Sequence, residues 1–139
     1  YAIVDSCGNI TNTIEKGKPF TVRMKVQMHA PIEYPIFALS IKDPKGTEIT
    51  GTNTMFEKTD FEVGPIMEIS FEQDMNLQGG EYLLSLGCTG YNGTDFTVYH
   101  RLYDVCNITV ASDKNTVGYY DMNSKITVQT YEGTNICRK

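Results

Sequence analysis

The sequence contains no tryptophan and only two histidines among its 139 residues, His29 and His100. Neither histidine belongs to an H-E-x-x-H sequence or a nucleophile motif, and no G-x-x-x-x-G-K-S/T phosphate-binding loop is present. No apolar run approaches the roughly 20 residues of a membrane-spanning helix, and no signal segment opens the chain. We therefore expect a domain that has no catalytic site and no cofactor, and that does not itself cross a membrane.

Basic residues are also few, because 12 Lys and Arg stand against 17 Asp and Glu, which gives a net charge of −5. An acidic domain without a basic stripe is poorly suited to bind nucleic acid or an anionic membrane. The chain fits one domain, residues 1–139, and is long enough to bury about two-thirds of its unfolded surface. It begins at Tyr1 rather than Met, which suggests a domain excised from a longer protein.

The four cysteines form no C-x-x-C pair and have no histidine nearby, so we expect no zinc site. Their even number permits two disulfides, as in a secreted protein, but the simpler interpretation is four reduced thiols in a cytoplasmic protein, with Cys88 and Cys106 as small core residues. Three N-x-S/T sequences are weak evidence for a secreted glycoprotein, because a chain rich in Asn and Thr produces them by chance. These residues are Cys7, Cys88, Cys106 and Cys137, and Asn9, Asn92 and Asn107.

Alternating apolar and polar side chains predict strands in most of the chain. The central segment, residues 34–54, is expected to be a buried strand, a tight turn over residues 43–46 and a threonine-rich return strand. Residues 82–88 form a second buried strand, whose inward side chains are Tyr82, Leu84, Leu86 and Cys88. Further strands are predicted in residues 1–8, 20–28, 67–71, 103–110 and 124–131, and residues 89–102 form a long hairpin loop or a strand extension.

Seven or eight short strands without a helical pattern predict an all-β fold, an antiparallel β-sandwich. Two sheets packed face to face would bury the inward side chains of these strands. The missing tryptophan argues against an antibody-type domain, whereas the broader immunoglobulin-like topology stays open.

A cluster of aromatic and polar side chains in residues 91–103 predicts a binding surface. Sugars present both hydroxyl groups and apolar C–H faces, so their sites combine aromatic rings with amides, carboxylates or guanidinium groups. Loops and hairpin ends supported by a sandwich often carry such residues. The alternative is that Tyr99 and Tyr103 pack as core. The candidate carbohydrate-binding residues are Tyr91, Asn92, Asp95, Tyr99, His100, Arg101 and Tyr103.

The outer face of the central sheet is a second candidate surface. Small side chains there would leave a shallow, partly polar groove for an extended ligand, unless another chain or the C-terminal segment covers it. Ser85 and Asn107 are the candidate binding residues on this face. The residues expected to point outward are Ala38, Ser40, Leu83, Ser85, Gly87, Asn107 and Thr109.

Several of these segments resemble, in order and spacing, the C-terminal domain of Wzt-type ATPases, which power ABC exporters of O-antigen and related cell-surface polysaccharides. The segments are FALSIKD at residues 37–43, Lys45-Gly46, GTNT at 51–54, GGEYLLSL at 79–86, Tyr103-Asp104 before NITV at 107–110, and Gly118. The resemblance covers roughly residues 3–130, but no aromatic cluster matches a known sugar site residue by residue.

The resemblance implies an immunoglobulin-like sandwich that recognises a finished glycan in the cytoplasm, at the inner face of the cell membrane, and delivers it to the ABC transporter subunits. It also implies a homodimer in which the C-terminal strands, residues 124–131, are exchanged. The nucleotide-binding domain would lie outside this sequence. The alternative is an extracellular adhesion or structural module with oxidised cysteines. An enzyme that uses acidic residues is a third, weaker hypothesis.

Overall fold

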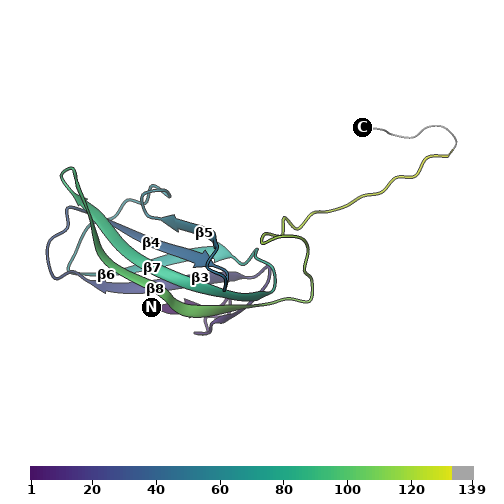
Figure 1. The fold of residues 1–139 in the computed structure, drawn as a ribbon, viewed down its shortest axis with the longest axis horizontal. Helices are drawn as coiled ribbons and strands as arrows, with labels where there is room; N and C mark the ends of the chain where they lie inside the picture. The colour runs from purple at the N-terminus through teal and green to yellow at the C-terminus, as the bar shows by residue number, and fades with distance from the viewer. Residues whose placement is uncertain (133–139) are drawn as a thin grey trace.

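The computed structural model describes residues 1–132, which form eight strands and no helix (Figure 1). Within this range there is accordingly no helix that could cross a membrane. The strands are β1 (Ala2–Val4), β2 (Thr13–Glu15), β3 (Pro19–Gln27), β4 (Tyr34–Lys42), β5 (Glu48–Asn53), β6 (Ile66–Asp74), β7 (Gly80–Asn92) and β8 (Asp95–Ala111).

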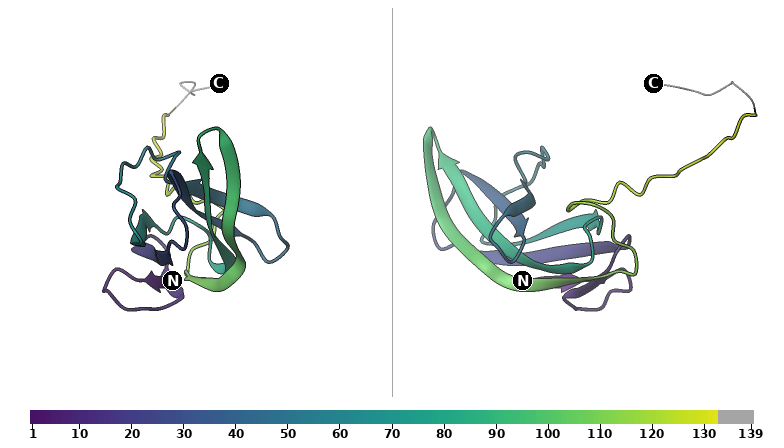
Figure 2. Two further views of the ribbon diagram at one scale, coloured as in Figure 1. Left: turned by 90° about the vertical axis from the view of Figure 1, so that its left-hand side faces the viewer. Right: turned by 45° about the vertical axis from the view of Figure 1, so that its right-hand side comes forward.

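The strands form two sheets, in the orders β1-β3-β6 and β2-β8-β7-β4-β5. Every pairing is antiparallel except that of β2 with β8, which is parallel. The predicted immunoglobulin-like β-sandwich is therefore confirmed. Figure 2 shows that β7 and β8 form a long, curved hairpin that extends past the rest of the sandwich.

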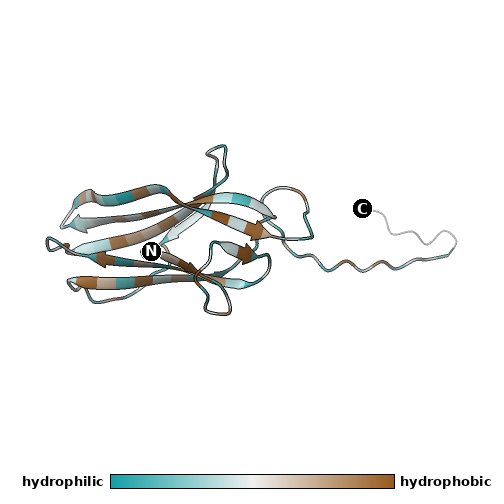
Figure 3. Cartoon of the chain, turned by 90° about the horizontal axis from the view of Figure 1, so that it is seen from below, coloured by the Kyte–Doolittle hydropathy of each residue, from teal (hydrophilic) through white to brown (hydrophobic). Residues whose placement is uncertain are grey.

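The core contains the side chains that the alternation placed inward, and the strands in Figure 3 are striped accordingly. Because successive strand residues point to opposite faces, one face of each strand can be apolar while the other stays polar. Phe37, Leu84 and Ile108 are completely buried. The predicted inward set of β7 is also buried, and Cys106 of β8, which pairs with Leu84, is partly buried and packs against this core.

The turn between β4 and β5 confirms the prediction for residues 43–46. The Asp43 carboxylate accepts hydrogen bonds from the backbone N–H groups of Thr47 and Lys45, at 2.9 and 3.0 Å. Gly46 adopts a φ of 90°, which favours glycine. These bonds, led by that from Thr47, hold the pKa of Asp43 below its ordinary value.

The segment that follows β8 returns to the sandwich and is held by polar contacts. The Lys16 ammonium lies 2.7 Å from Asp121 Oδ2 and holds the pKa of that buried carboxyl well below its ordinary value. The N–H of Gln78 donates to the carbonyl of Tyr119, and the hydroxyl of Tyr119 donates to Asp43 Oδ2 at 2.9 Å. Residues 112–123 are thus fastened along the end of the sandwich.

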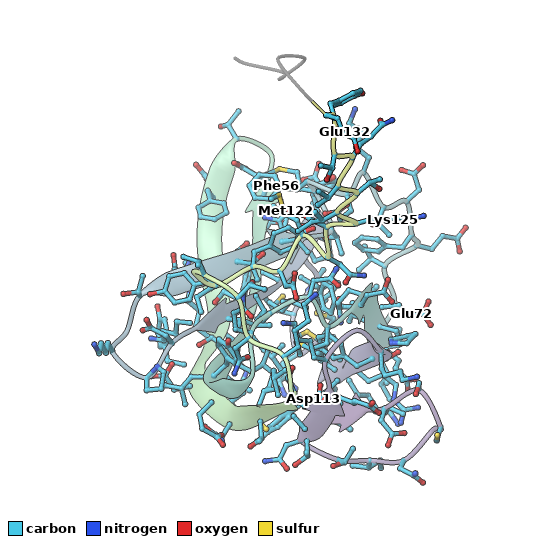
Figure 4. The ribbon with its side chains drawn as sticks, turned by 90° about the vertical axis from the view of Figure 1, so that its right-hand side faces the viewer. Phe56, Glu72, Asp113, Met122, Lys125 and Glu132 are labelled. Atoms are coloured by element: carbon cyan, nitrogen blue, oxygen red, sulfur yellow. The ribbon has the colours of Figure 1, made fainter. Side chains whose placement is uncertain are left out.

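Two sequence predictions were wrong. The short parallel strand β2 was missed, because three residues are too few to show alternation. Residues 124–131 were predicted to form the last strand, but they pair with no strand within residues 1–132, and Ile126 and Val128 are 83 and 84% exposed. A strand needs a hydrogen-bonded neighbour, and no other part of residues 1–132 provides one for this segment. Figure 1 shows this segment extending away from both sheets, and Figure 4 labels Met122, Lys125 and Glu132 along it.

Candidate functional site

The pairing of β4 with β7 determines which side chains lie on the outer face of the five-stranded sheet. Phe37 pairs with Cys88, and both are buried between the sheets. The neighbouring pair, Ala38 and Gly87, must therefore face away from the core. We call this side of strands β4, β7 and β8 the outer face.

Three aromatic side chains form a row across the outer face near the end of the β7–β8 hairpin. Tyr34 of β4 pairs with Tyr91 of β7, which in turn pairs with Phe96 of β8. The rings of Tyr91 and Phe96 have centroids 5.1 Å apart and are tilted by 50°. Tyr34 and Phe96 are 49 and 52% exposed, so this row presents flat apolar surface to solvent.

Arg101 lies further along the outer face, beyond a row formed by Ile36, Thr89 and Val98. Arg101 pairs with Gly87, which has no side chain. A Cβ built on Gly87 would lie 3.7 Å from Arg101 Cγ, so the aliphatic part of the arginine side chain lies over the glycine. Its Nη1 donates a hydrogen bond of 3.2 Å to the hydroxyl of Tyr103, which is 66% exposed. None of the ion pairs among residues 1–132 involves Arg101.

A bulge in β8 positions Tyr103. Between Leu84 and Leu86 the register shifts, and Asp104 takes a φ of 52°, which non-glycine residues rarely adopt. The N–H of Asp104 donates to Ser85 Oγ at 2.9 Å, and the carboxylate lies 3.0 Å from the Lys42 ammonium. Ser85 was expected to line an open groove, but it is 8% exposed because the bulge covers it.

The other end of the outer face is polar. Asn107 donates a hydrogen bond to Glu81, and the Thr109 hydroxyl donates to the same carboxylate at 2.8 Å. Asn107, a predicted binding residue, is therefore exposed but already bonded within the sheet. Sequence reasoning had not assigned Glu81, Tyr34 or Phe96 to the site, and only the strand pairing connects them to it.

Tyr99 and His100 lie on the face of β8 opposite to the outer face. The register shifts a second time between Cys88 and Thr89, which leaves Tyr99 as an extra residue and pairs His100 with the buried Cys88. Both line a cleft of about 550 Å³ between the two sheets. Tyr99 is 37% exposed. The alternative that Tyr103 packs as core is wrong, since that side chain is exposed on the outer face.

Asn92 and Asp95 pair beside the two-residue hairpin turn, where both are exposed. Asn92 Nδ2 donates to the Tyr99 hydroxyl at 3.0 Å. The nine predicted residues are therefore divided. The outer face holds Tyr91, Arg101, Tyr103, Ser85 and Asn107, the cleft holds Tyr99 and His100, and the tip holds Asn92 and Asp95.

The described residues contain no group of His, Cys, Asp and Glu that could hold a metal ion. Cys7, Cys88 and Cys106 form no disulfide with one another, and Cys137 lies outside the described residues. Burial raises the pKa values of the Cys88 and Cys106 thiols, which disfavours the reactive thiolate.

Comparison with known proteins agrees with this architecture. The family model of the Wzt C-terminal domain matches residues 1–122. A solved structure, described as the crystal structure of the C-terminal domain of wzt, has a TM-score of 0.83 and 23% sequence identity. The alignment covers 92% of this chain and 80% of that one, which shows a shared fold. A search of curated proteins finds no significant match. The chain belongs to the Wzt C-terminal domain family.

Proposed function

We propose that this is a non-catalytic carbohydrate-binding domain that recognises a cell-surface polysaccharide, such as an O-antigen-like glycan, for export by an ABC transporter. Membership of the Wzt C-terminal domain family supports a role in polysaccharide export. The observation that carries the proposal is the outer face, where Tyr34, Tyr91 and Phe96 share one sheet surface with Arg101 and Tyr103.

This surface offers the two kinds of contact that a sugar needs. The exposed rings can pack on the apolar C–H faces of pyranose units. Arg101, which forms no ion pair in the described chain, has guanidinium N–H groups that can donate to ring and hydroxyl oxygens, and Tyr103 adds a hydroxyl beside it. Glu81 can accept hydrogen bonds from sugar hydroxyls at the polar end.

The affinity expected of such a surface is weak, about micromolar to millimolar, because an open polar face gains little from desolvation. The sheet itself is well ordered by its pairing, so the aromatic row is presented without folding on binding. Repeated sugar units along a polysaccharide would compensate for weak single contacts.

We further propose the wider context. The domain would be the C-terminal part of a longer exporter ATPase, and it would act in the cytoplasm, at the inner face of the membrane, where it would deliver the glycan to the transporter subunits. Residues 124–131 have exposed apolar side chains at Ile126 and Val128, and their backbone pairs with no strand of the described chain, which suits exchange between two subunits of a homodimer. Sedimentation of the full chain and of a chain ending at residue 123 tests this: only the full chain should dimerise.

An NMR titration with the surface polysaccharide of the source organism tests the binding proposal. Resonances of Tyr91 and Arg101 should shift, and Tyr91→Ala and Arg101→Ala should each weaken binding by about three- to tenfold. Tyr131→Ala is the matched control, since Tyr131 is 53% exposed but lies in the C-terminal segment. Absence of shifts on the outer face at millimolar glycan would refute the proposal.

A further inference from the structure

The cleft between the two sheets is separate from the outer face, on the other side of β7 and β8. One wall is formed by the end of β3 and the connection to β4, and the other by β7 and β8. Its volume of about 550 Å³ lies within the range of small-molecule sites, roughly 300–1,000 Å³. Its apolar lining includes Met24, Met28, Ile32, Leu86, Cys88 and Leu102.

Specific hydrogen bonds join the two walls. Tyr99, which the register shift adds to β8, is held by Asn92 Nδ2. Asn92 Oδ1 accepts the N–H of Glu33 at 2.8 Å, and Glu33 Oε2 accepts the N–H of Gly93 at 3.1 Å. These bonds tie the hairpin tip to the connection between β3 and β4. The cleft is therefore a built feature of the fold, and bulges commonly occur beside binding sites.

The lining of the cleft has little charge. Although the chain has 17 acidic residues, no Asp or Glu of residues 1–132 lines the cleft. Lys25 is the only Lys or Arg in the lining, and it pairs with Glu68 on the face of β3 opposite to Met24, where both are exposed. The uncharged hydrogen-bonding side chains of the lining are Tyr1, Gln27, His29, Tyr99 and His100.

We propose that this cleft binds a neutral amphipathic molecule, in which an alkyl or acyl chain carries a hydroxylated head group. The chain would displace water from the apolar walls, where Met24 and Met28 can adapt their flexible side chains to it. The head would bond to the tyrosines and histidines of the lining. An ionised head would lose hydration on entering the apolar cleft, and the side chain of Lys25, the one Lys or Arg that lines it among residues 1–132, lies on the opposite face of β3. This inference does not rest on the carbohydrate-binding proposal.

The test uses the full chain with ¹³C-labelled methionine methyl groups. Octyl glucoside, added below its micelle-forming concentration, should shift the Met24 and Met28 methyl resonances in a saturable way and leave Met122, which is 76% exposed, unchanged. Glucose alone should cause no shift, and octanoate, which has a similar chain and a charged head, should bind at least fivefold more weakly.

Two exposed positions provide matched variants. Ala30→Trp places a large ring at the cleft and should weaken octyl glucoside binding by about tenfold or more, whereas Val117→Trp, on a residue that is 94% exposed elsewhere, should not. The proposal is overturned if octyl glucoside leaves Met24 and Met28 unshifted, if glucose alone produces the same shifts, or if octanoate binds equally well. Unchanged binding by a folded Ala30→Trp variant would also overturn it.

Discussion

Gly90 allows β7 to approach the chain around the start of β4, and its replacement by alanine tests whether this close approach is real. A Cβ at Gly90 would lie 2.7 Å from the carbonyl oxygen of Tyr34, 3.0 Å from Ile32 Cγ2 and 3.2 Å from Pro35 Cα. Two of these three atoms belong to the backbone, which cannot move aside without disturbing the strand pairing. The contact therefore has to be relieved by a shift of β4 relative to β7.

The expected free-energy change follows from two opposing effects. Overpacking at a close contact destabilises by about 1–3 kcal/mol. Replacing glycine by alanine also restricts the unfolded chain, which stabilises by about 0.4–1 kcal/mol where the native backbone tolerates the change. The net prediction for Gly90→Ala is a destabilisation of about 1–2 kcal/mol.

Gly87→Ala is the matched control on the same strand. Its Cβ would lie 3.7 Å from the nearest atoms, Arg101 Cγ and the carbonyl oxygen of His100, which is ordinary contact. We expect the stability of this variant to be unchanged or raised by up to about 1 kcal/mol.

Urea unfolding followed by circular dichroism measures both variants. With a slope of about 1–3 kcal/mol per molar urea, a loss of about 1–2 kcal/mol should lower the midpoint of Gly90→Ala by roughly 0.3–2 M relative to the wild type, while that of Gly87→Ala should not fall. Equal midpoints for the two variants would show that β4 and β7 are not as close at Gly90 as described. The slope should stay constant, since a changed slope would mean a changed unfolded state.

Three further predictions concern ionisable groups. Asp121→Asn removes the buried carboxylate charge that pairs with the Lys16 ammonium, so the amides of residues 112–123 should exchange hydrogen faster. Unchanged exchange rates would contradict a stabilising role of this ion pair. Because hydrogen bonds, led by that from Thr47, lower the native pKa of Asp43, its stabilising contribution is complete above the ordinary value of 3.8 and is lost as the pH falls through the lower native pKa. Acid titration of Asp43→Asn should therefore show a smaller loss of stability than the wild type in that range. Iodoacetamide should modify the exposed Cys7 quickly but Cys88 only after unfolding, because Cys88 is buried and burial raises the pKa of its thiol. Equal modification rates for the two cysteines would contradict this prediction. If the protein contained no free thiols, the alternative of an extracellular module would be favoured.

Much of the fold could be predicted from local alternation. The inward side chains of residues 34–42 and 82–88, and the turn at Asp43, follow from patterns contained within a few neighbouring residues. A strand buried on one face requires such a pattern whatever its partner is. The aromatic and polar composition of residues 91–103 predicted a binding surface, which stays a prediction, but it could not predict how these side chains are arranged.

Strand pairing determined the rest. Simple alternation through β8 would place Arg101 on the face opposite to Phe96. The bulge at Tyr99 adds one residue, so the side chains after it point to the faces opposite to those that alternation predicts. Arg101 therefore lies with Phe96 on the outer face, and Tyr99 lines the cleft. Tyr34 joins this site from β4, more than 50 residues earlier in the sequence. Local sequence therefore fixes which residues are fit to be buried. The positions of bulges, and the faces on which side chains meet, depend on hydrogen bonds between strands that are distant in the chain, so only the tertiary structure decides them.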